Sequence, residues 1–195
     1  MHATKWLLGN NADLNAKTND GWTALHWAAE SGHFEMVKWL VEERNIDVNA
    51  KTNDGWTSLH WAAQSGRFEM VKWLVEERNI DVNAKTNDGW TALHWAAQSG
   101  HFEMVKWLVE ERNIDVNAKT NNGWTALHCA AQTGRFEMVK WLVEERNADI
   151  NIANVDGKTA SDVTWRSDLS RYLTIWNARS ILQVQSAGED DPMTM

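Results

Sequence analysis

The stretch DGWTALHWAAQSG at Asp88–Gly100 is the most informative in the chain, because it returns three more times. One letter differs at Asp54–Gly66, and looser copies stand at Asp20–Gly32 and Asn122–Gly134. The residues that share a 34-residue spacing are Gly21, Gly55, Gly89, Gly123 and Gly157, then His26, His60, His94 and His128, and then Trp39, Trp73, Trp107 and Trp141. Such a period predicts supersecondary units that bury their apolar faces only against their neighbours.

The first half of one unit contains the signals of a turn followed by a short helix. The segment VNAKTNDGWT at 48–57 is rich in turn residues, and Gly55 can adopt a positive φ. Thr57 stands where a helix N-cap belongs, and Gly66 is placed to end that helix. We therefore expect a short helix between Thr57 and Gly66.

A second, longer helix is expected in RFEMVKWLVEER at 67–78. Its predicted apolar stripe consists of Phe68, Val71, Leu74 and Val75. Asn79 is the expected left-handed residue that ends this helix, and an extended IDVNA segment follows it. One unit is thus a turn, a short helix, a longer helix and a loop.

These motifs resemble those of the ankyrin-repeat family, although 34 residues is the period of tetratricopeptide repeats and 33 that of ankyrin repeats. TALHWAA at Thr23–Ala29 resembles the ankyrin signature T-P-L-H-x-A-A, and GHFEMVKWL at Gly32–Leu40 and DVNA at Asp47–Ala50 resemble the rest of that repeat. The additional residue falls in EERNIDVNA, after the second helix. The resemblance covers roughly residues 5–182 and implies an all-α repeat solenoid of helix-loop-helix units joined by β-hairpin-like turns.

Two departures from the family pattern recur in each repeat, and we expect both to lower stability somewhat. The family's proline, which normally fixes the helix start, is replaced by Ala24, Ser58, Ala92 and Ala126. The aspartate of its turn is replaced by Thr18, Thr52, Thr86 and Thr120. Packing of the numerous tryptophans is expected to offset these changes.

The ends of the chain depart from the repeat in different ways. ATKWLL near the N-terminus resembles a second helix without its first, as expected of a mid-repeat start or of a fragment of a longer array. Near the C-terminus the rhythm continues, but Ser161 and Asp162 replace the motif Leu and His, as in a capping repeat. The expected organisation is a partial repeat at 1–19, repeats at 20–53, 54–87, 88–121 and 122–155, a divergent cap at 156–186 and an acidic disordered tail at 187–195.

Composition limits the classes of function. A formal net charge of −8 and a sequence pI near 5.3 argue against binding of nucleic acid or an anionic membrane. A single cysteine, Cys129, excludes an internal disulfide framework and suits a reducing compartment. With neither a membrane-spanning apolar run nor a signal-peptide pattern, the sequence predicts a soluble monomer in the cytoplasm, with the nucleus left open.

The residues that could carry chemistry are better explained by structure. Equivalent histidines cannot share a zinc ion, because stacked helices lie about 8–10 Å apart and zinc ligands only about 4 Å apart. The ankyrin resemblance instead implies that each histidine bonds to the motif threonine and to the neighbouring turn. Cys129 occupies a position that is tryptophan in the other repeats, so we expect it to fill core space. The sequence predicts no enzyme, no metal and no cofactor.

Three series of tryptophans recur. Those of the second helix, with Trp6, and those of the first helix (Trp27, Trp61 and Trp95) are expected to pack between repeats. The series that follows the turn glycine is Trp22, Trp56, Trp90 and Trp124. In an ankyrin-like repeat this position projects toward the concave face, where tryptophan is a frequent binding hot spot. The alternative is an inert ladder in which these four rings stack on one another, and the sequence favours neither.

The family's target-facing positions give a candidate partner-binding face. These positions are Asn19, Asp20, Trp22, Glu30 and Ser31; Asn53, Asp54, Trp56, Gln64 and Ser65; Asn87, Asp88, Trp90, Gln98 and Ser99; and Asn121, Asn122, Trp124, Gln132 and Thr133. They hardly vary between repeats, which fits a repetitive ligand, a young duplication or a consensus-like repeat sequence. The predicted function is therefore non-catalytic binding of another protein through the concave face. The alternative is a structural scaffold or spacer segment of a longer multidomain protein, without its own dedicated partner.

The asparagine of the family's Asp-Val-Asn motif is a known kind of hydroxylation target. Its counterparts here are Asn49, Asn83, Asn117 and Asn151. The inserted residue shifts the upstream leucine by one position, so we expect a hydrogen-bonding role in the turn to explain these asparagines better than hydroxylation.

Overall fold

The computed structural model describes residues 13–188, and these residues form two compact units that divide between Ile114 and Asp115. The described residues contain ten helices and no strand, in agreement with the all-α repeat fold expected from the sequence. Most of the partial repeat expected at 1–19 lies outside the described residues. So does the expected tail, except for residues 187 and 188, which continue the last helix.

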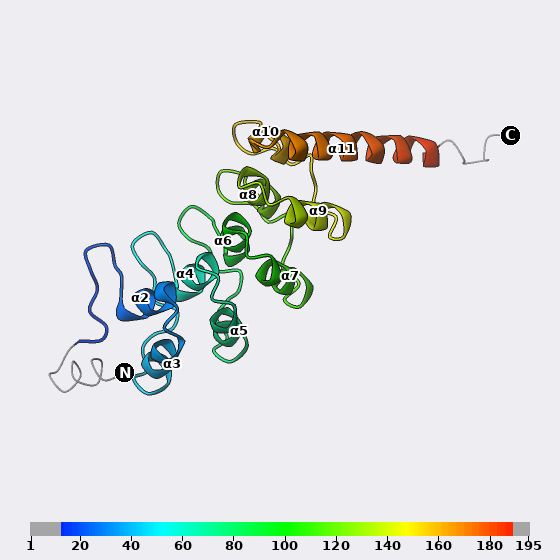
Figure 1. Cartoon of the computed structure of the whole chain (residues 1–195). Coiled ribbons are helices and arrows are strands. Elements are labelled where there is room, and N and C mark those ends of the chain that lie inside the picture. Colours follow the sequence, from blue (N-terminus) through cyan, green and yellow to red (C-terminus); the bar gives the residue numbers. More distant parts are fainter. Residues whose placement is uncertain (1–12, 189–195) are drawn as a thin grey trace. The chain divides into compact units, whose positions relative to one another are not determined.

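The first unit contains three helix pairs of one design (Figure 1). The first helices of the pairs are α2 (Ala24–Ser31), α4 (Ser58–Gln64) and α6 (Ala92–Ser99), and the second helices are α3 (Phe34–Glu42), α5 (Phe68–Glu76) and α7 (Phe102–Glu110). Helix α4 packs against both α2 and α6, and each first helix packs against the second helix of its own pair. The first helices thus form a continuous inner row from which the hairpin turns project.

The second unit contains a fourth pair and a divergent final pair. The fourth pair consists of α8 (Ala126–Gln132) and α9 (Phe136–Glu144), and the final pair of α10 (Ala160–Val163) and α11 (Ser167–Gly188). Helix α10 packs against both α8 and α11. A one-turn first helix and a long second helix distinguish this pair from the others.

Helix boundaries follow the predicted local signals. Thr57 is the N-cap of α4, with extended backbone at φ −112° and ψ 170°, and it shares a reciprocal capping box with His60. Gly66 has φ +71° after the helix, and Asn79 has φ +52° after α5. The predictions of an N-cap, a glycine stop and a left-handed asparagine are therefore confirmed.

The core is built from the inner faces of both helices. Leu59, Val71 and Leu74 are fully buried, and Ala62 and Ala63 let α4 approach its neighbours closely. Each large aliphatic side chain buried in this way contributes about 1.5–3 kcal/mol.

The predicted apolar stripe of α5 was partly wrong. Val71 and Leu74 are buried, but Phe68 and Val75 are only half-buried. Met70 and Trp73 take their place in the core. The buried arc is displaced because α5 packs on α4 and also receives aromatic rings from adjacent repeats, for example Phe34, whose ring centroid lies 5.8 Å from that of Trp73.

The threonines that replace the family's turn aspartate retain a hydrogen-bonding function. Thr52 is buried, and its Oγ1 accepts the Trp56 N–H at 3.1 Å while its own N–H donates to the Trp56 carbonyl at 2.9 Å. These bonds close the hairpin-like turn. In the last repeat Asn154 fills the position, and its Oδ1 accepts the N–H groups of Asp156 and Lys158.

Candidate partner-binding face

The hairpin tips of the first unit are joined by a hydrogen-bonded ladder. The Asn53 N–H donates to the Asp20 carbonyl at 3.0 Å, and its Nδ2 donates to the Asn19 carbonyl at 2.8 Å. Asn87 repeats both bonds to Asp54 and Asn53, at 2.9 Å each. Two of the predicted contact residues, Asn53 and Asn87, therefore use their side chains to hold the tips together.

The same ladder explains the invariant turn glycine. Gly55 has φ +80°, and a Cβ at this position would lie 2.6 Å from Asn87 Oδ1 and 2.9 Å from Asn87 N. Only glycine fits both the backbone angle and the close approach of the next tip. The tips are thus a preformed frame, and Asp20, Asp54 and Asp88 are exposed on it.

The turn tryptophans of the first unit neither project freely nor stack only on one another. The ring centroids of Trp22 and Trp56 lie 4.3 and 4.0 Å from that of Trp61, which belongs to α4. Trp56 and Trp90 each lie 4.3 Å from Trp95 of α6. The turn and first-helix series therefore alternate in one stack, which we call the inner tryptophan stack: Trp27, Trp22, Trp61, Trp56, Trp95 and Trp90.

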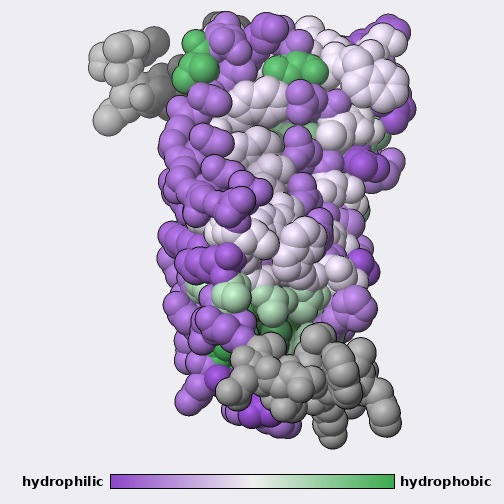
Figure 2. All heavy atoms as spheres, turned by 90° about the vertical axis from the view of Figure 1, so that its left-hand side faces the viewer, coloured by the Kyte–Doolittle hydropathy of each residue, from purple (hydrophilic) through white to green (hydrophobic). Residues whose placement is uncertain are grey.

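This arrangement corrects both interpretations of the turn series. Trp22, Trp56 and Trp90 are half-buried, so they are not freely displayed anchors, and their ladder includes the first-helix rings. The expectation that Trp27 packs between repeats was wrong, since it lies at the end of the stack and is 51% exposed. Figure 2 looks onto the side from which the hairpins project in Figure 1, and it shows side chains near the middle of the hydropathy scale between hydrophilic margins.

The stack is organised by ring packing rather than by hydrogen bonds. Offset and tilted aromatic pairs each contribute about 0.5–1.5 kcal/mol beyond the area that they bury. The Nε1 atoms of Trp61 and Trp95 are buried and make no hydrogen bond with the protein.

Tryptophans of the second helices have a different environment. Trp73 and Trp107 are only 6% and 4% exposed. The guanidinium of Arg78 lies 4.6 Å from the ring centroid of Trp73, and its Nη2 forms a short ion pair with Glu42. One repeat further on, the guanidinium of Arg112 lies 4.8 Å from the ring centroid of Trp107 and forms an ion pair with Glu76. The prediction that this series packs between repeats is confirmed for these two residues.

The recurring histidines are structural, as the family resemblance implied. His60 Nδ1 accepts the Thr57 N–H at 3.1 Å and lies 2.9 Å from Thr57 Oγ1, while Nε2 donates to the Ala84 carbonyl at 2.9 Å. Burial lowers the pKa of His60 to about 4, against an opposing effect of the backbone hydrogen bonds. Burial also lowers the pKa values of His26 and His128, which make the same contacts.

The final repeat replaces this histidine with Asp162. Its Oδ2 accepts from the Thr159 N–H at 2.9 Å and from Thr159 Oγ1 at 2.8 Å, and these hydrogen bonds lower the pKa of Asp162. An ionised aspartate keeps the capping box but has no proton to donate to a further turn.

The predicted residues at the ends of the first helices lie near the surface. Glu30, Gln64 and Gln98 are half-buried in the first unit, and Gln132 is exposed in the second. Ser31 is exposed, Ser65 and Ser99 are half-buried, and Thr133 Oγ1 donates to the Cys129 carbonyl at 3.0 Å.

The predicted residues divide between the two units. The sets of the first three repeats belong to the first unit, where the tip ladder and the inner tryptophan stack bring them together. The set Asn121, Asn122, Trp124, Gln132 and Thr133 belongs to the second unit. There Asn121 and Asn122 are exposed, and the Asn122 carbonyl accepts the Val155 N–H at 3.0 Å. The Trp124 ring lies 5.7 Å from that of His128.

Cys129 is fully buried, and burial raises the pKa of its thiol strongly. It therefore packs as a small apolar residue, as predicted, and lacks the thiolate character of a nucleophile. The described residues contain no group of three or more His, Cys, Asp and Glu side chains that could hold a metal ion.

The asparagines of the Asp-Val-Asn motif make hydrogen bonds where the second unit shows them. Asn117 Oδ1 accepts the Asp149 N–H at 2.8 Å, and Asn151 Oδ1 accepts from Asn177 Nδ2 at 2.9 Å. Both bonds reach another segment of the chain rather than the turn itself, so they bear out a hydrogen-bonding role for these two asparagines but not the expected place within the turn.

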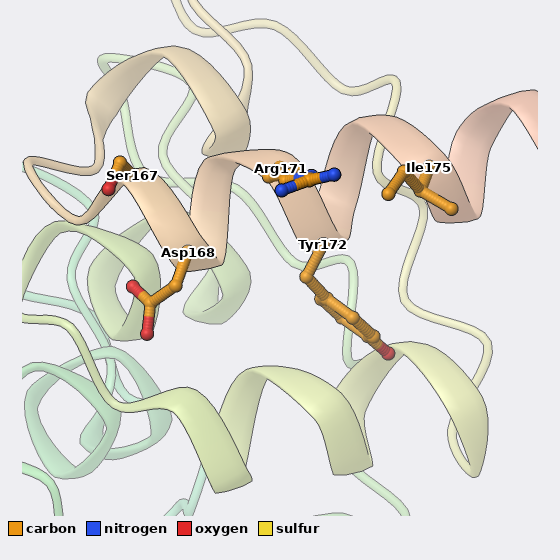
Figure 3. Close-up of a pocket in the computed structure, with 5 residues that line it drawn as sticks. All are labelled: Ser167, Asp168, Arg171, Tyr172 and Ile175. Atoms are coloured by element: carbon orange, nitrogen blue, oxygen red, sulfur yellow. The ribbon is translucent and has the colours of Figure 1, made fainter.

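A hollow of about 480 Å³ lies beside α11 and is lined by Ser167, Asp168, Arg171, Tyr172 and Ile175 (Figure 3). Tyr172 points from α11 toward α9, and its hydroxyl donates to Glu144 Oε1 at 3.0 Å. Its ring centroid lies 5.4 Å from that of Phe136. Tyr172 thereby combines the ring contact and the glutamate contact that a Trp–Arg pair makes in the first unit, so the hollow belongs to the packing of the final pair.

Comparisons with known proteins agree with the repeat assignment. The sequence model of the family described as Ankyrin repeats (3 copies) matches residues 1–86 and 78–154. A protein named VAPYRIN-LIKE from Medicago truncatula is 47% identical over 38 residues, which make up 20% of this chain and 8% of that protein. Acyl-CoA-binding domain-containing protein 6 from Homo sapiens is 42% identical over 43 residues, or 22% of this chain and 15% of that protein. The chain therefore matches only a small part of the length of these two relatives.

No helix among the described residues has the length and apolar character needed to cross a membrane.

Proposed function

The chain belongs to the ankyrin-repeat family, whose members are generally non-catalytic protein-interaction modules, and we propose that it binds a protein partner through the concave side of its repeats. The contact surface consists of the hairpin tips, the edge of the inner tryptophan stack and the ends of the first helices. The partner is another protein, and binding requires no cofactor.

The observation that carries this proposal is the combination of a hydrogen-bonded frame with partly exposed aromatic side chains. Asn53 and Asn87 fix the spacing of the tips, so little order remains to be gained when a partner binds. Next to these tips, Trp56 and Trp90 expose part of their rings. Tryptophan in such a setting is a common source of binding energy.

The test must spare the residues that hold the fold. Alanine at Trp56 would interrupt the inner tryptophan stack and alanine at Trp90 would shorten it, so a loss of binding in these variants could not be separated from a loss of stability. A sharper variant combines Asp54→Ala, Asp88→Ala, Gln64→Ala and Gln98→Ala, whose side chains lie at the tips and helix ends. The matched control carries Glu69→Ala and Glu103→Ala, which remove exposed charges from the second helices.

Immobilised wild-type, variant and control proteins would be incubated with cell extract and the captured proteins identified. Circular dichroism and urea unfolding would first establish that the three proteins are equally folded. We expect a partner that is retained by the wild type and control and lost by the variant. Equal capture by all three, or no capture at all, would contradict the proposal and favour a scaffold or spacer segment.

A further inference from the structure

The inner tryptophan stack ends at Trp27 and Trp90, and of these two end rings Trp27 is exposed whereas Trp90 is half-buried. Trp22, Trp61, Trp56 and Trp95 each have a tryptophan ring on both sides, so they present only their edges. Trp27 contacts Trp22 at 4.3 Å and is 51% exposed. The face of an indole ring carries the negative part of its quadrupole and attracts cations. Trp27 is therefore the position in this stack where a cation can approach a ring face.

A carboxylate follows this ring on the same helix. Glu30 follows Trp27 by three residues on α2, and residues three apart occupy the same side of a helix. Glu30 is half-buried, so its charge is not fully hydrated. The equivalent positions of the other repeats carry the neutral Gln64, Gln98 and Gln132. The exposed ring and the negative charge thus coincide in one repeat.

The protein itself shows which group completes such a pair. On the second helices the Arg78 guanidinium covers Trp73 at 4.6 Å and pairs with Glu42. Arg112 does the same with Trp107, at 4.8 Å, and Glu76. Trp27 and Glu30 supply side chains of the same two kinds on one helix, a 51% exposed tryptophan and a glutamate three residues later.

We propose that Trp27 and Glu30 form a recognition position for an arginine side chain of the partner protein. This inference rests on the proposed function and adds the chemistry of the group that is recognised. Arginine suits the position better than lysine, because its planar guanidinium can stack on indole while donating two hydrogen bonds to a carboxylate. The partner segment therefore presents an exposed arginine at the end of the stack.

The test uses the pentapeptide acetyl-Gly-Gly-Arg-Gly-Gly-amide as the probe and does not need the natural partner. Its control peptide carries citrulline, which has nearly the shape of arginine but no charge. NMR spectra of the labelled protein would follow the indole N–H signal of Trp27, assigned with a Trp27→Phe variant. We expect a saturable shift with the arginine peptide and a smaller one with a lysine peptide.

Two single-charge variants complete the test. Glu30→Gln should weaken binding of the arginine peptide by about fivefold, the effect of losing an ion pair near the surface while the Trp27 ring is kept. Glu35→Gln, which removes an exposed carboxylate from α3, should leave binding unchanged. Equal shifts with the citrulline peptide, or equal losses in both variants, would overturn the inference. The capture experiment depends on Asp54, Asp88 and the glutamines, so failure of either proposal can be distinguished from failure of the other.

Discussion

The inner and outer sides of each repeat use tryptophan for different purposes. On the inner side, Trp56 and Trp61 stack on each other and remain partly exposed. On the outer side, Trp73 is buried beneath Arg78 and against the Phe34 ring. Both series recur at the same spacing in the sequence, so periodicity alone does not distinguish a ring that is packed from one that is displayed. The neighbours that cover each ring make the difference.

The largest expected effect comes from removing an outer tryptophan. Trp73→Ala should lower the free energy of unfolding by about 3–5 kcal/mol, because it empties a buried site and removes the surface on which Arg78 stacks. Trp27→Ala, at the exposed end of the inner stack, should cost less than about 1.5 kcal/mol, since it removes one aromatic contact. Urea unfolding of both variants, followed by circular dichroism, measures the difference. Similar losses in the two variants would refute the contrast between the two sides.

An intermediate effect should follow from acidification, because His60 lies beneath the inner stack with its ring 6.1 Å from that of Trp56. Its pKa is about 4 in the folded protein and 6.5 in the unfolded chain, so the unfolded chain binds the proton more readily. The contribution of His60 to the free energy of unfolding is therefore fully present above about pH 6.5 and is lost as the pH falls from 6.5 toward 4. Between about pH 8 and pH 5, His60 alone should account for a loss of roughly 2 kcal/mol.

The measurement compares the pH dependence of unfolding in the wild type with that of a His60→Gln variant. Other groups titrate in both proteins, so the difference between the two curves isolates His60. The variant should be less stable at neutral pH and should lose less stability on acidification. Parallel curves would mean that His60 is not buried as a neutral, hydrogen-bonded ring.

The sequence was sufficient to predict the parts of the fold that depend on local chemistry. Thr57, Gly66 and Asn79 each occupy positions where backbone geometry favours those residue types, and the helix boundaries follow them. The histidine contacts followed from the family resemblance. The assignment of Trp73 to the core was also correct, because its helix position and neighbours recur in each repeat.

The environment of the other tryptophans could not be predicted from one repeat at a time. Trp56 contacts Trp61 within its own repeat but also Trp95 of the next, so the stack exists only when repeats are assembled. The exposure of Trp27 likewise depends on which rings lie beside it. Glu30 was predicted as a contact residue, whereas the significance of its neighbour Trp27 required the three-dimensional arrangement.

The smallest expected effect concerns the start of an inner helix. It tests whether a substitution there can raise the free energy of unfolding. Ala92 is the first residue of α6 and follows Thr91, whose backbone is extended at φ −114° and ψ 172°. Proline is compatible with a first helical position and with an extended residue before it. Ala92→Pro should therefore raise the free energy of unfolding by about 0.4–1 kcal/mol, mainly by restricting the unfolded chain.

Ala96→Pro provides the matched control, because Ala96 lies inside the same helix and is equally buried. Proline there removes a hydrogen bond within the helix and collides with the preceding turn, at a cost of about 3 kcal/mol or more. Urea unfolding measures both variants. A loss of stability with Ala92→Pro would mean that the buried helix start lacks room for the ring. In that case the absence of the family's proline would be a consequence of packing beneath the inner tryptophan stack, and the two sides of the repeat would differ in their tolerance to substitution as well as in their exposure.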